Sequence, residues 1–348
     1  SLQDLTGFNG RCDAIFFTTD VAMLPPSDMK PLNLFRKEKL GISEIPQNAG
    51  SFDLVVIGGG IAGMSAAVTA ARLGVKVALI HDRPVLGGNN SSEVRVHLGG
   101  RIGVKPYKEL GALQKEFGPL RGGNAQPGEF YEDDKKAKII AEEENISFFP
   151  NYHAFAVEMN GNKIQKVIAK HIETGMEMAF EGAVFSDCTG DGTIGYLAGA
   201  DYKMGRESKT EFNESTAPEQ ADKLTMGASV QWYSVDKNEP VSFPMFKYGL
   251  SFDHLRAEKV TMGEWTWETG MNYDQINDFE RIRDYGLMVV YSNWSFLKNE
   301  FNENNLYKNR ALEWVAFVSG KRESRRLLGD HILTENDLIN YRVYPDGS

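Results

Sequence analysis

The stretch 52-FDLVVIGGGIAGMSAAVTAARLGVKVALI-80 decides the fold of this chain. Residues 52–57 form a short apolar, β-branched run, which is typical of a strand buried on both faces of a parallel sheet. A glycine-rich turn follows, and an alanine-rich helical pattern then runs over residues 61–73 until Gly74 ends it. Residues 75–80 have the composition of a second buried strand. The stretch therefore predicts a complete βαβ unit.

Within the turn, Gly58, Gly60 and Gly63 have the spacing G-x-G-x-x-G. Gly58 suits a tight turn, Gly60 lets the main chain approach a pyrophosphate, and Gly63 lets the helix pack closely on the strand. The pyrophosphate would lie on the helix N-terminus, at Ile61 and Ala62. An ordinary glycine turn is the alternative, but strand, turn, slim helix and second strand agree. The pattern favours a dinucleotide site.

The end of the second strand leaves the choice of dinucleotide open. An acidic residue about 20 positions after the glycines ordinarily binds the adenosine ribose. That place holds His81, with Asp82 next to it, so either residue could make the contact. Arg83 follows, and an arginine there would instead suit a 2'-phosphate, which keeps NADP as a rival.

Gly87 and Gly88 form a second glycine pair after this strand, and simple NAD dehydrogenases do not need one. At this point the sequence resembles the FAD-dependent oxidoreductases of the glutathione-reductase-like superfamily. Within it, 82-DRPVLGGNNSSEVRVHLGG-100 looks most like bacterial FAD-dependent oxidoreductases often encoded beside polysaccharide-degradation genes. The resemblance implies that FAD is the cofactor and that its phosphate and ribityl chain lie along a run of small and polar residues. These residues are Gly87, Gly88, Asn89, Asn90, Ser91 and Ser92.

A polar loop is the simpler reading of that run. More distant relatives, the fumarate-reductase flavoproteins, carry a covalent flavin on a loop histidine where this chain has Asn90. The resemblance therefore implies dissociable FAD.

Three further strands and a second glycine motif follow. Residues 148–157, 163–171 and 176–185 predict an antiparallel meander with glycine-containing turns. The chain then runs into 184-VFSDCTGDGTIGYLAGAD-201, where the family carries a similar Thr-Gly-Asp-Gly motif that returns to the dinucleotide. The resemblance assigns that role to Thr189, Gly190, Asp191 and Gly192, and places the Ala154 backbone near the adenine. A chance turn is the alternative.

Residues 93–98 alternate apolar and polar side chains, which predicts a strand. Glu93, Arg95 and His97 would then share one face close to the flavin. His97 is our candidate base for a hydroxyl proton, because an ordinary imidazole titrates near neutrality. Arg95 is a candidate for holding an anion. A half-exposed strand with solvated charges explains the pattern equally well.

The block 320-GKRESRR-326 also resembles the family. Helical spacing would place Arg322 and Arg325 on neighbouring turns, where they could hold a carboxylate or stabilise an anionic flavin. A solvated charged face is the alternative. Thr334 with Asp337 predicts a capping box at the start of a later helix.

Aromatic residues accumulate between residues 202 and 310, which predicts an inserted substrate domain. Indole rings form platforms for sugar faces, so 263-GEWTWETG-270 is a candidate wall of a carbohydrate pocket, although core packing is the commoner fate of tryptophan. Residues 12–26 resemble the last strand of an upstream β module, and prolines then indicate a linker. We expect the nucleotide domain over residues 51–201 and its return over 311–348. The family completes this domain with a later segment, so we expect a fragment truncated at both ends.

Composition excludes several classes of function. The net charge of −10 makes nucleic acid an unlikely partner, and no apolar run could span a bilayer. The histidines and the two cysteines, Cys12 and Cys188, show no zinc-type spacing, so no metal site is predicted. The first residue is Ser, which indicates a lost natural N-terminus and leaves cytoplasmic and periplasmic locations open.

Together these features predict an α/β fold. It comprises an FAD/NAD(P)-binding Rossmann-like parallel sheet, an antiparallel β-meander and an inserted α+β substrate domain. The leading hypothesis is an FAD-dependent oxidoreductase that takes hydride from a small hydroxyl-bearing substrate, with a carbohydrate suggested by family context. The alternatives are an NADP-dependent dehydrogenase and a non-catalytic carbohydrate-binding protein. Neither the substrate nor the electron acceptor that reoxidises the flavin is identified by a motif.

Overall fold

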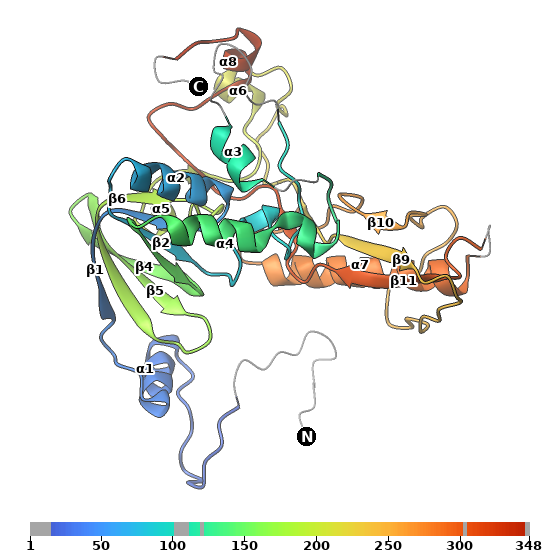
Figure 1. Ribbon diagram of the computed structural model, residues 1–348, viewed down its shortest axis with the longest axis horizontal. Helices are drawn as coiled ribbons and strands as arrows, with labels where there is room; N and C mark the ends of the chain where they lie inside the picture. The colour runs from blue at the N-terminus through green and yellow to red at the C-terminus, as the bar shows by residue number, and fades with distance from the viewer. Residues whose placement is uncertain (1–14, 101–110, 119–121, 302–304, 345–348) are drawn as a thin grey trace.

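A computed structural model describes residues 15–100, 111–118, 122–301 and 305–344 of the 348-residue chain. Six strands form its central sheet in the order β3-β2-β1-β6-β5-β4 (Figure 1). The first four are parallel, whereas β6, β5 and β4 are antiparallel neighbours. Their bounds are β1 Gln47–Ile57, β2 Val77–His81, β3 Ile146–Pro150, β4 Tyr152–Asn160, β5 Lys163–His171 and β6 Glu177–Asp187.

The central strands are buried on both faces, as their apolar sequences predict. Val56 and Leu79 face the helices, whereas Val55 and Ile80 face a second core that includes residues of the meander. Helices α2 (Ile61–Arg72), α3 (Ala112–Phe117) and α4 (Asp133–Glu142) contribute to the first core, and the short α5 (Thr193–Leu197) contributes to the second. The β1-α2-β2 unit is therefore confirmed, with α2 beginning at Ile61 and Gly74 in the left-handed region at φ 84°.

Residues 228–316 form a second, smaller assembly beside the sheet (Figure 1). Strands β9, β10 and β11 make a small antiparallel sheet, and it packs with α7 around the buried, edge-to-face pair Trp232 and Trp294. Two-stranded pairings join β12 to β8 and β13 to β7. The bounds are β7 Tyr202–Lys203, α6 Lys209–Phe212, β8 Ala228–Ser229, β9 Trp232–Asp236, β10 Met262–Gly263, α7 Phe279–Asn299, β11 Arg310–Val315, β12 Gly320–Lys321, β13 Arg326–Leu327 and α8 Glu335–Ile339.

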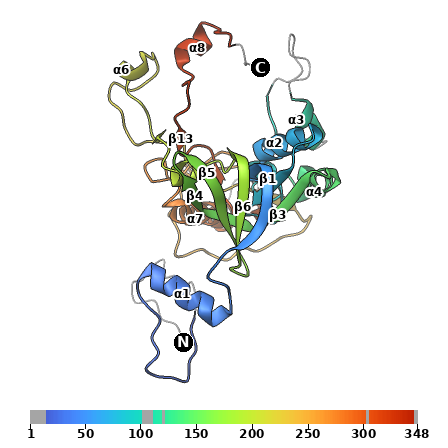
Figure 2. The same cartoon turned by 90° about the vertical axis from the view of Figure 1, so that its left-hand side faces the viewer.

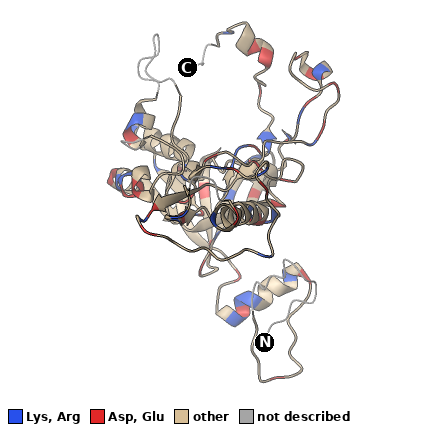
Figure 3. Ribbon diagram, turned by 90° about the vertical axis from the view of Figure 1, so that its right-hand side faces the viewer, with Lys and Arg blue, Asp and Glu red and all other residues tan. Residues whose placement is uncertain are grey.

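The first and last helices of the described part lie on opposite sides of the sheet. Figure 2 shows α1 (Met29–Leu40) below it and α6 and α8 above it on extended segments. The basic last turn of α1 and the acidic first turn of α8 are consequently far apart (Figure 3). The capping box between Thr334 and Asp337 is present as predicted. Within the described ranges, no helix has the length and apolarity that a bilayer crossing requires.

Several sequence expectations are wrong in detail. The first meander strand is really two strands, because Asn151 adopts φ 62° and redirects the chain, so that β3 joins the parallel edge and only β4 the meander. Residues 15–26 are not a strand but irregular, and residues 12–14 lie outside the described part. The proline-containing linker instead forms helix α1, which buries none of its residues.

Two further expectations concern the site. Residues 93–98 form no strand, since Arg95 lies in the left-handed region at φ 67° and interrupts the alternation. Residues 320–327 form no helix but two short strands, β12 and β13, each paired with a distant segment. The arginines of this block therefore do not share a helical face.

Candidate nucleotide and flavin site

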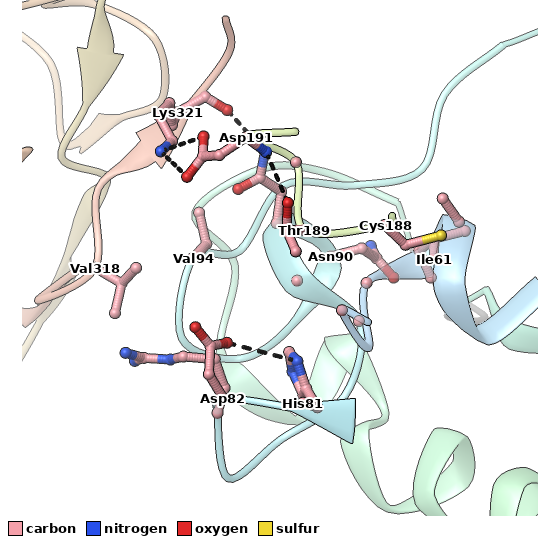
Figure 4. Close-up of a pocket in the computed structure, with 18 of the residues that line it drawn as sticks. Ile61, His81, Asp82, Asn90, Val94, Cys188, Thr189, Asp191, Val318 and Lys321 are labelled. Carbon is pink, nitrogen blue, oxygen red and sulfur yellow. Dashed lines mark hydrogen bonds and ion pairs between the residues drawn. The ribbon is translucent and has the colours of Figure 1, made fainter. Parts of the chain in front are cut away.

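A cavity of about 590 Å³ opens where β1, β2 and β6 end, which is the switch point of the parallel sheet (Figure 4). Its walls come from six places far apart in sequence. These are the first glycine turn, the end of β2 with the loop after it, the start of β4, the Thr-Gly-Asp motif, Phe279 and residues 318–323. Ligands of open α/β sheets bind in this position.

The first glycine turn is fixed by close main-chain contacts. Gly58 has φ 106°, and a Cβ there would lie 2.2 Å from the carbonyl oxygen of Cys188 at the end of β6. A Cβ on Gly63 would lie 1.8 Å from the carbonyl oxygen of Gly58. The first and third glycines therefore let β1, α2 and β6 approach one another.

The second glycine has a different environment. Gly60 is the N-cap of α2, and its φ of −69° suits any residue. Among the described residues, a Cβ there would meet only Gly88, at 3.9 Å. The first-turn N–H groups of α2, including those of Ile61 and Ala62, cannot reach an intrahelical carbonyl and line the cavity. A side chain at Gly60 would project into space that the fold leaves free beside these donors. Gly60 and the first-turn N–H groups of α2 together form a cradle that fits a diphosphate.

The second glycine pair continues that cradle. The Gly87 N–H donates to the Gly59 carbonyl at 2.8 Å, which holds the loop against the first turn. Residues Gly88–Asn90 form a 3₁₀ turn, and the buried Oδ1 of Asn90 has no hydrogen-bond partner in the described part of the protein. A buried amide oxygen without a donor indicates that a bound group completes this loop.

The structure separates the roles of His81 and Asp82. His81 is buried, and its Nδ1 accepts from the Gly59 N–H at 3.0 Å while Nε2 lies 2.9 Å from the Val85 carbonyl. Both bonds require neutral imidazole protonated on Nε2. Asp82 lines the cavity, and its carboxylate accepts at 3.2 Å from the imidazole of His153, at the start of β4. Asp82 is the more exposed of the two side chains, so we expect it, rather than His81, to meet a ribose.

We expect His81 to make stability depend on pH. Burial lowers its pKa from the ordinary value of 6.5, and the protonated ring could not accept from Gly59. The unfolded chain binds the proton first, so stability is complete above about pH 6.5 and falls as pH drops below it, by at most ~1.4 kcal/mol per pH unit. Urea unfolding of wild type and His81→Gln at several pH values measures this contribution. An equal pH slope in both proteins would contradict it.

The Arg83 side chain is already paired with a carboxylate. Its guanidinium makes a bidentate pair with Glu93, with nitrogen to oxygen distances of 2.6 and 3.0 Å, and this pairing raises the pKa of Arg83. The arrangement weakens the case for a 2'-phosphate contact, because such a phosphate would have to compete with a carboxylate.

A buried lysine, which sequence reasoning missed, anchors the second glycine pair. Lys136 on α4 is fully buried, and its Nζ donates to the Asn90 carbonyl at 2.7 Å and to the Tyr131 carbonyl. Asp133, 3.7 Å away, also accepts from the Ser92 N–H. Burial lowers the pKa of Lys136. The start of α4 therefore holds the Gly88–Asn90 turn in place.

We expect Lys136→Met to weaken FAD binding by about tenfold, since the Asn90 carbonyl loses a charged donor worth roughly 1.5–3 kcal/mol. Flavin fluorescence titration measures the dissociation constant. Lys138→Met on the same helix is the matched control, because that side chain is 73 % exposed. Equal affinities of the two variants would contradict the anchoring role.

The Thr-Gly-Asp-Gly motif also lies at the cavity. Asp187, at the end of β6, accepts from the Ile194 and Gly195 N–H groups at 2.8 and 3.0 Å and so orients α5. Asp191 pairs with Lys321 at 2.6 Å, as Figure 4 shows, and the Lys321 carbonyl accepts from the Asn89 side chain at 3.0 Å. Residues 318–323 thereby close one side of the cavity.

The loop over residues 93–98 brings only some of its polar residues to the cavity. Glu93 and His97 line it, together with Val94, Val96 and Leu98. Arg95 does not. Its guanidinium lies 3.7 Å from the Trp314 ring centre and donates to the carbonyls of Ser92 and Gln126.

The two candidate arginines are likewise separated. Arg322 lines the cavity, pairs with Glu268 and lies 5.3 Å from the Trp265 ring centre. Arg325 lies outside it, with its guanidinium 4.0 Å from the Tyr196 ring centre.

The cavity thus collects most of the residues that the sequence singles out. It is lined by Gly58, Gly60, Ile61, Ala62, His81, Asp82, Arg83, Gly87, Gly88, Asn89, Asn90, His97, Ala154, Thr189, Gly190, Asp191 and Arg322. It is not lined by Gly63, Ser91, Ser92, Arg95, Gly192 or Arg325. Ser91 and Ser92 instead make hydrogen bonds that shape the loop, and Gly192 begins α5. In the described residues, no cluster of side chains suits a metal ion.

A switch-point cavity with an uncapped helix N-terminus and two facing glycine turns defines a dinucleotide-binding α/β protein. The family model described as FAD dependent oxidoreductase matches residues 53–347. The chain belongs to this family, and FAD is its cofactor.

Solved flavoproteins are similar over parts of the chain. The flavin-dependent monooxygenase PieE, solved with FAD and substrate, is 11% identical with a TM-score of 0.34, covering 54% of this chain and 36% of its own. Glycerol-3-phosphate dehydrogenase from Bacillus halodurans, complexed with FAD, is 15% identical with a TM-score of 0.34, covering 61% and 46%. L-proline dehydrogenase from P. horikoshii is 19% identical with a TM-score of 0.27, covering 48% and 26%. The chain spans less than half the length of each.

Proposed function

We propose that this chain forms the FAD-binding part of an oxidoreductase that oxidises a small, uncharged, hydroxyl-bearing compound, with carbohydrates as the first class to test. The observation that carries the proposal is the diphosphate cradle at Gly60 and Gly88 beside a wall that holds His97. FAD, when bound, supplies the two-electron acceptor.

Different residues of the protein would bind the cofactor and accept the proton of the substrate. The α2 N-terminus and the Gly88–Asn90 turn would hold the diphosphate and ribityl chain, and Asp82 would hold the adenosine ribose. His97 would take the hydroxyl proton of the substrate as its carbon gives up hydride, so the alcohol becomes a carbonyl compound.

The charge pattern of the wall favours an uncharged substrate. Each of three cations at the cavity is paired with a carboxylate: Arg83 with Glu93, Lys321 with Asp191, and Arg322 with Glu268. An anionic substrate would have to displace one of these carboxylates. A polyhydroxyl compound, by contrast, can donate to carboxylates and accept from cations at the same time.

The tryptophans support the carbohydrate class less than their number suggests. Trp232 and Trp294 belong to a core, and neither Trp265 nor Trp267 lines the cavity. The segment 263–270 instead reaches the site through its carboxylates, since Glu268 pairs with Arg322 and Glu264 accepts from Asn124.

Anaerobic mixing of the FAD-loaded protein with three sets of compounds tests the proposal. We expect neutral sugars or polyols to bleach the flavin absorbance, whereas sugar phosphates and hydroxy acids should not. Bleaching by anionic substrates alone would contradict the charge argument. Tight NADPH binding by a protein that takes up no flavin would favour the dehydrogenase alternative.

A further inference from the structure

His97 belongs to a chain of hydrogen bonds that the reaction proposed above does not explain. Asn124 is 7 % exposed, and its Oδ1 lies 2.9 Å from the His97 main-chain nitrogen and 3.0 Å from the His97 Nδ1. Its Nδ2 donates to a Glu264 carboxylate oxygen at 3.1 Å. The chain therefore runs from the cavity wall to the segment 263–270.

The donor and the acceptor of each bond can be assigned, because a main-chain N–H can only donate and a carboxylate can only accept. The main-chain N–H of His97 is a donor, so the atom of Asn124 that faces it must be the amide oxygen. The amide NH₂ then faces the Glu264 carboxylate, which accepts. Because the same oxygen faces Nδ1, the neutral imidazole of His97 must carry its proton on Nδ1.

This tautomer leaves Nε2 with its lone pair. In the described part of the protein, Nε2 makes no hydrogen bond, and its ring lines the cavity. His81 in the same cavity has the opposite tautomer, with Nδ1 as acceptor and the proton on Nε2. The two histidines are thus set for different tasks by their partners, one for holding a glycine turn and one for accepting a proton.

We propose that Asn124, oriented by Glu264, is a positioning residue that holds His97 as the Nδ1–H tautomer and makes Nε2 the proton acceptor of the cavity. The role given to Nε2 rests on the proposed function, whereas the tautomer does not. A histidine base needs a partner on its other nitrogen, since a ring free to exchange tautomers would present a donor to the substrate hydroxyl much of the time.

Nitrogen-15 NMR of the full chain with labelled histidine tests the proposal, because the two ring nitrogens have distinct shifts in each tautomer. The signals of His97 are those lost in His97→Gln. We expect wild-type His97 to be the Nδ1–H tautomer and Asn124→Ala to shift the ratio of Nδ1–H to Nε2–H by about tenfold toward Nε2–H, as loss of one hydrogen bond implies. His81, expected as Nε2–H throughout, verifies that each variant is folded.

A double variant provides the rescue. In Asn124→Asp with Glu264→Gln, the aspartate still accepts from the main-chain N–H and from Nδ1–H, and the glutamine amide supplies the donor between the two side chains. We expect this pair to restore the Nδ1–H tautomer. Nε2–H in wild type, or a ratio unchanged by Asn124→Ala, would overturn the proposal. Failure of the proposed function would show separately, as absence of flavin reduction in a protein with the expected tautomer.

Discussion

Replacement of Gly60 by alanine is expected to raise the dissociation constant for FAD by about 100-fold, or ~2.7 kcal/mol, while the protein stays folded. The φ of −69° accepts any residue, and within the described part of the chain the added methyl group would meet only Gly88, at an ordinary 3.9 Å. The methyl group would fill the space beside the first-turn N–H groups of α2, and a diphosphate could not reach those donors. Titration with FAD, followed by flavin fluorescence, measures the loss.

Gly329→Ala is the matched control, because a Cβ there makes only an ordinary contact of 3.7 Å, with the His331 carbonyl oxygen, outside the cavity. Thermal unfolding without FAD should be similar for wild type and both variants. An unchanged FAD affinity in Gly60→Ala would mean that the diphosphate is bound elsewhere.

Alanine at Gly63 should act on the fold rather than on the cofactor alone. Its Cβ would lie 1.8 Å from the Gly58 carbonyl oxygen, so α2 would have to move away from the turn that it packs on. Overpacking typically costs about 1–3 kcal/mol, and we expect this case at the upper end because a main-chain neighbour cannot rotate away. We expect urea unfolding of the FAD-free protein to show this destabilisation.

Thr69→Ala on the exposed side of α2 controls for the effect of a substitution in the same helix. A Gly63→Ala protein as stable as this control would show that α2 does not need its close approach to β1. Alanine substitutions at two glycines of one motif should therefore have different effects. Gly60→Ala should lower the affinity for FAD, whereas Gly63→Ala should lower the stability of the FAD-free protein.

The sequence predicted the nucleotide-binding unit because its signals are local. Two apolar strands, a glycine turn and a slim helix lie within residues 47–81, and each element depends mainly on its own composition. The same holds for the capping box at Thr334, whose partner is three residues away. Local patterns of this kind predict the folded structure correctly because the tertiary contacts favour the same conformations.

The errors occur where distant contacts override local pattern. Alternation over residues 93–98 indicated a strand, but this segment pairs with no strand in the described ranges, and the positive φ of Arg95 interrupts the extended conformation. Helical spacing of the arginines in 320–326 was misleading because Gly320 and Arg326 pair with Ser229 and Lys203, about a hundred residues away. Pairing partners at that separation leave no trace in a local window.

The positioning residues were missed for the same reason. Asn124 lies 27 residues from His97 and 140 from Glu264, in a loop whose composition indicates only a turn. Lys136 has the helical surroundings of a surface lysine, yet it is fully buried under the Asn90 carbonyl. Only the folded chain brings these groups together.

The central claim is that main-chain N–H groups at the start of α2 hold the FAD diphosphate. Amide NMR during a titration with FAD tests it most directly. The account predicts that the largest shifts occur at Ile61, Ala62, Gly88 and Asn89, and that Gly60→Ala abolishes them. Shifts centred elsewhere, such as on the α7 cavity lined by Tyr273 and Tyr285, with the α2 amides unmoved, would contradict it.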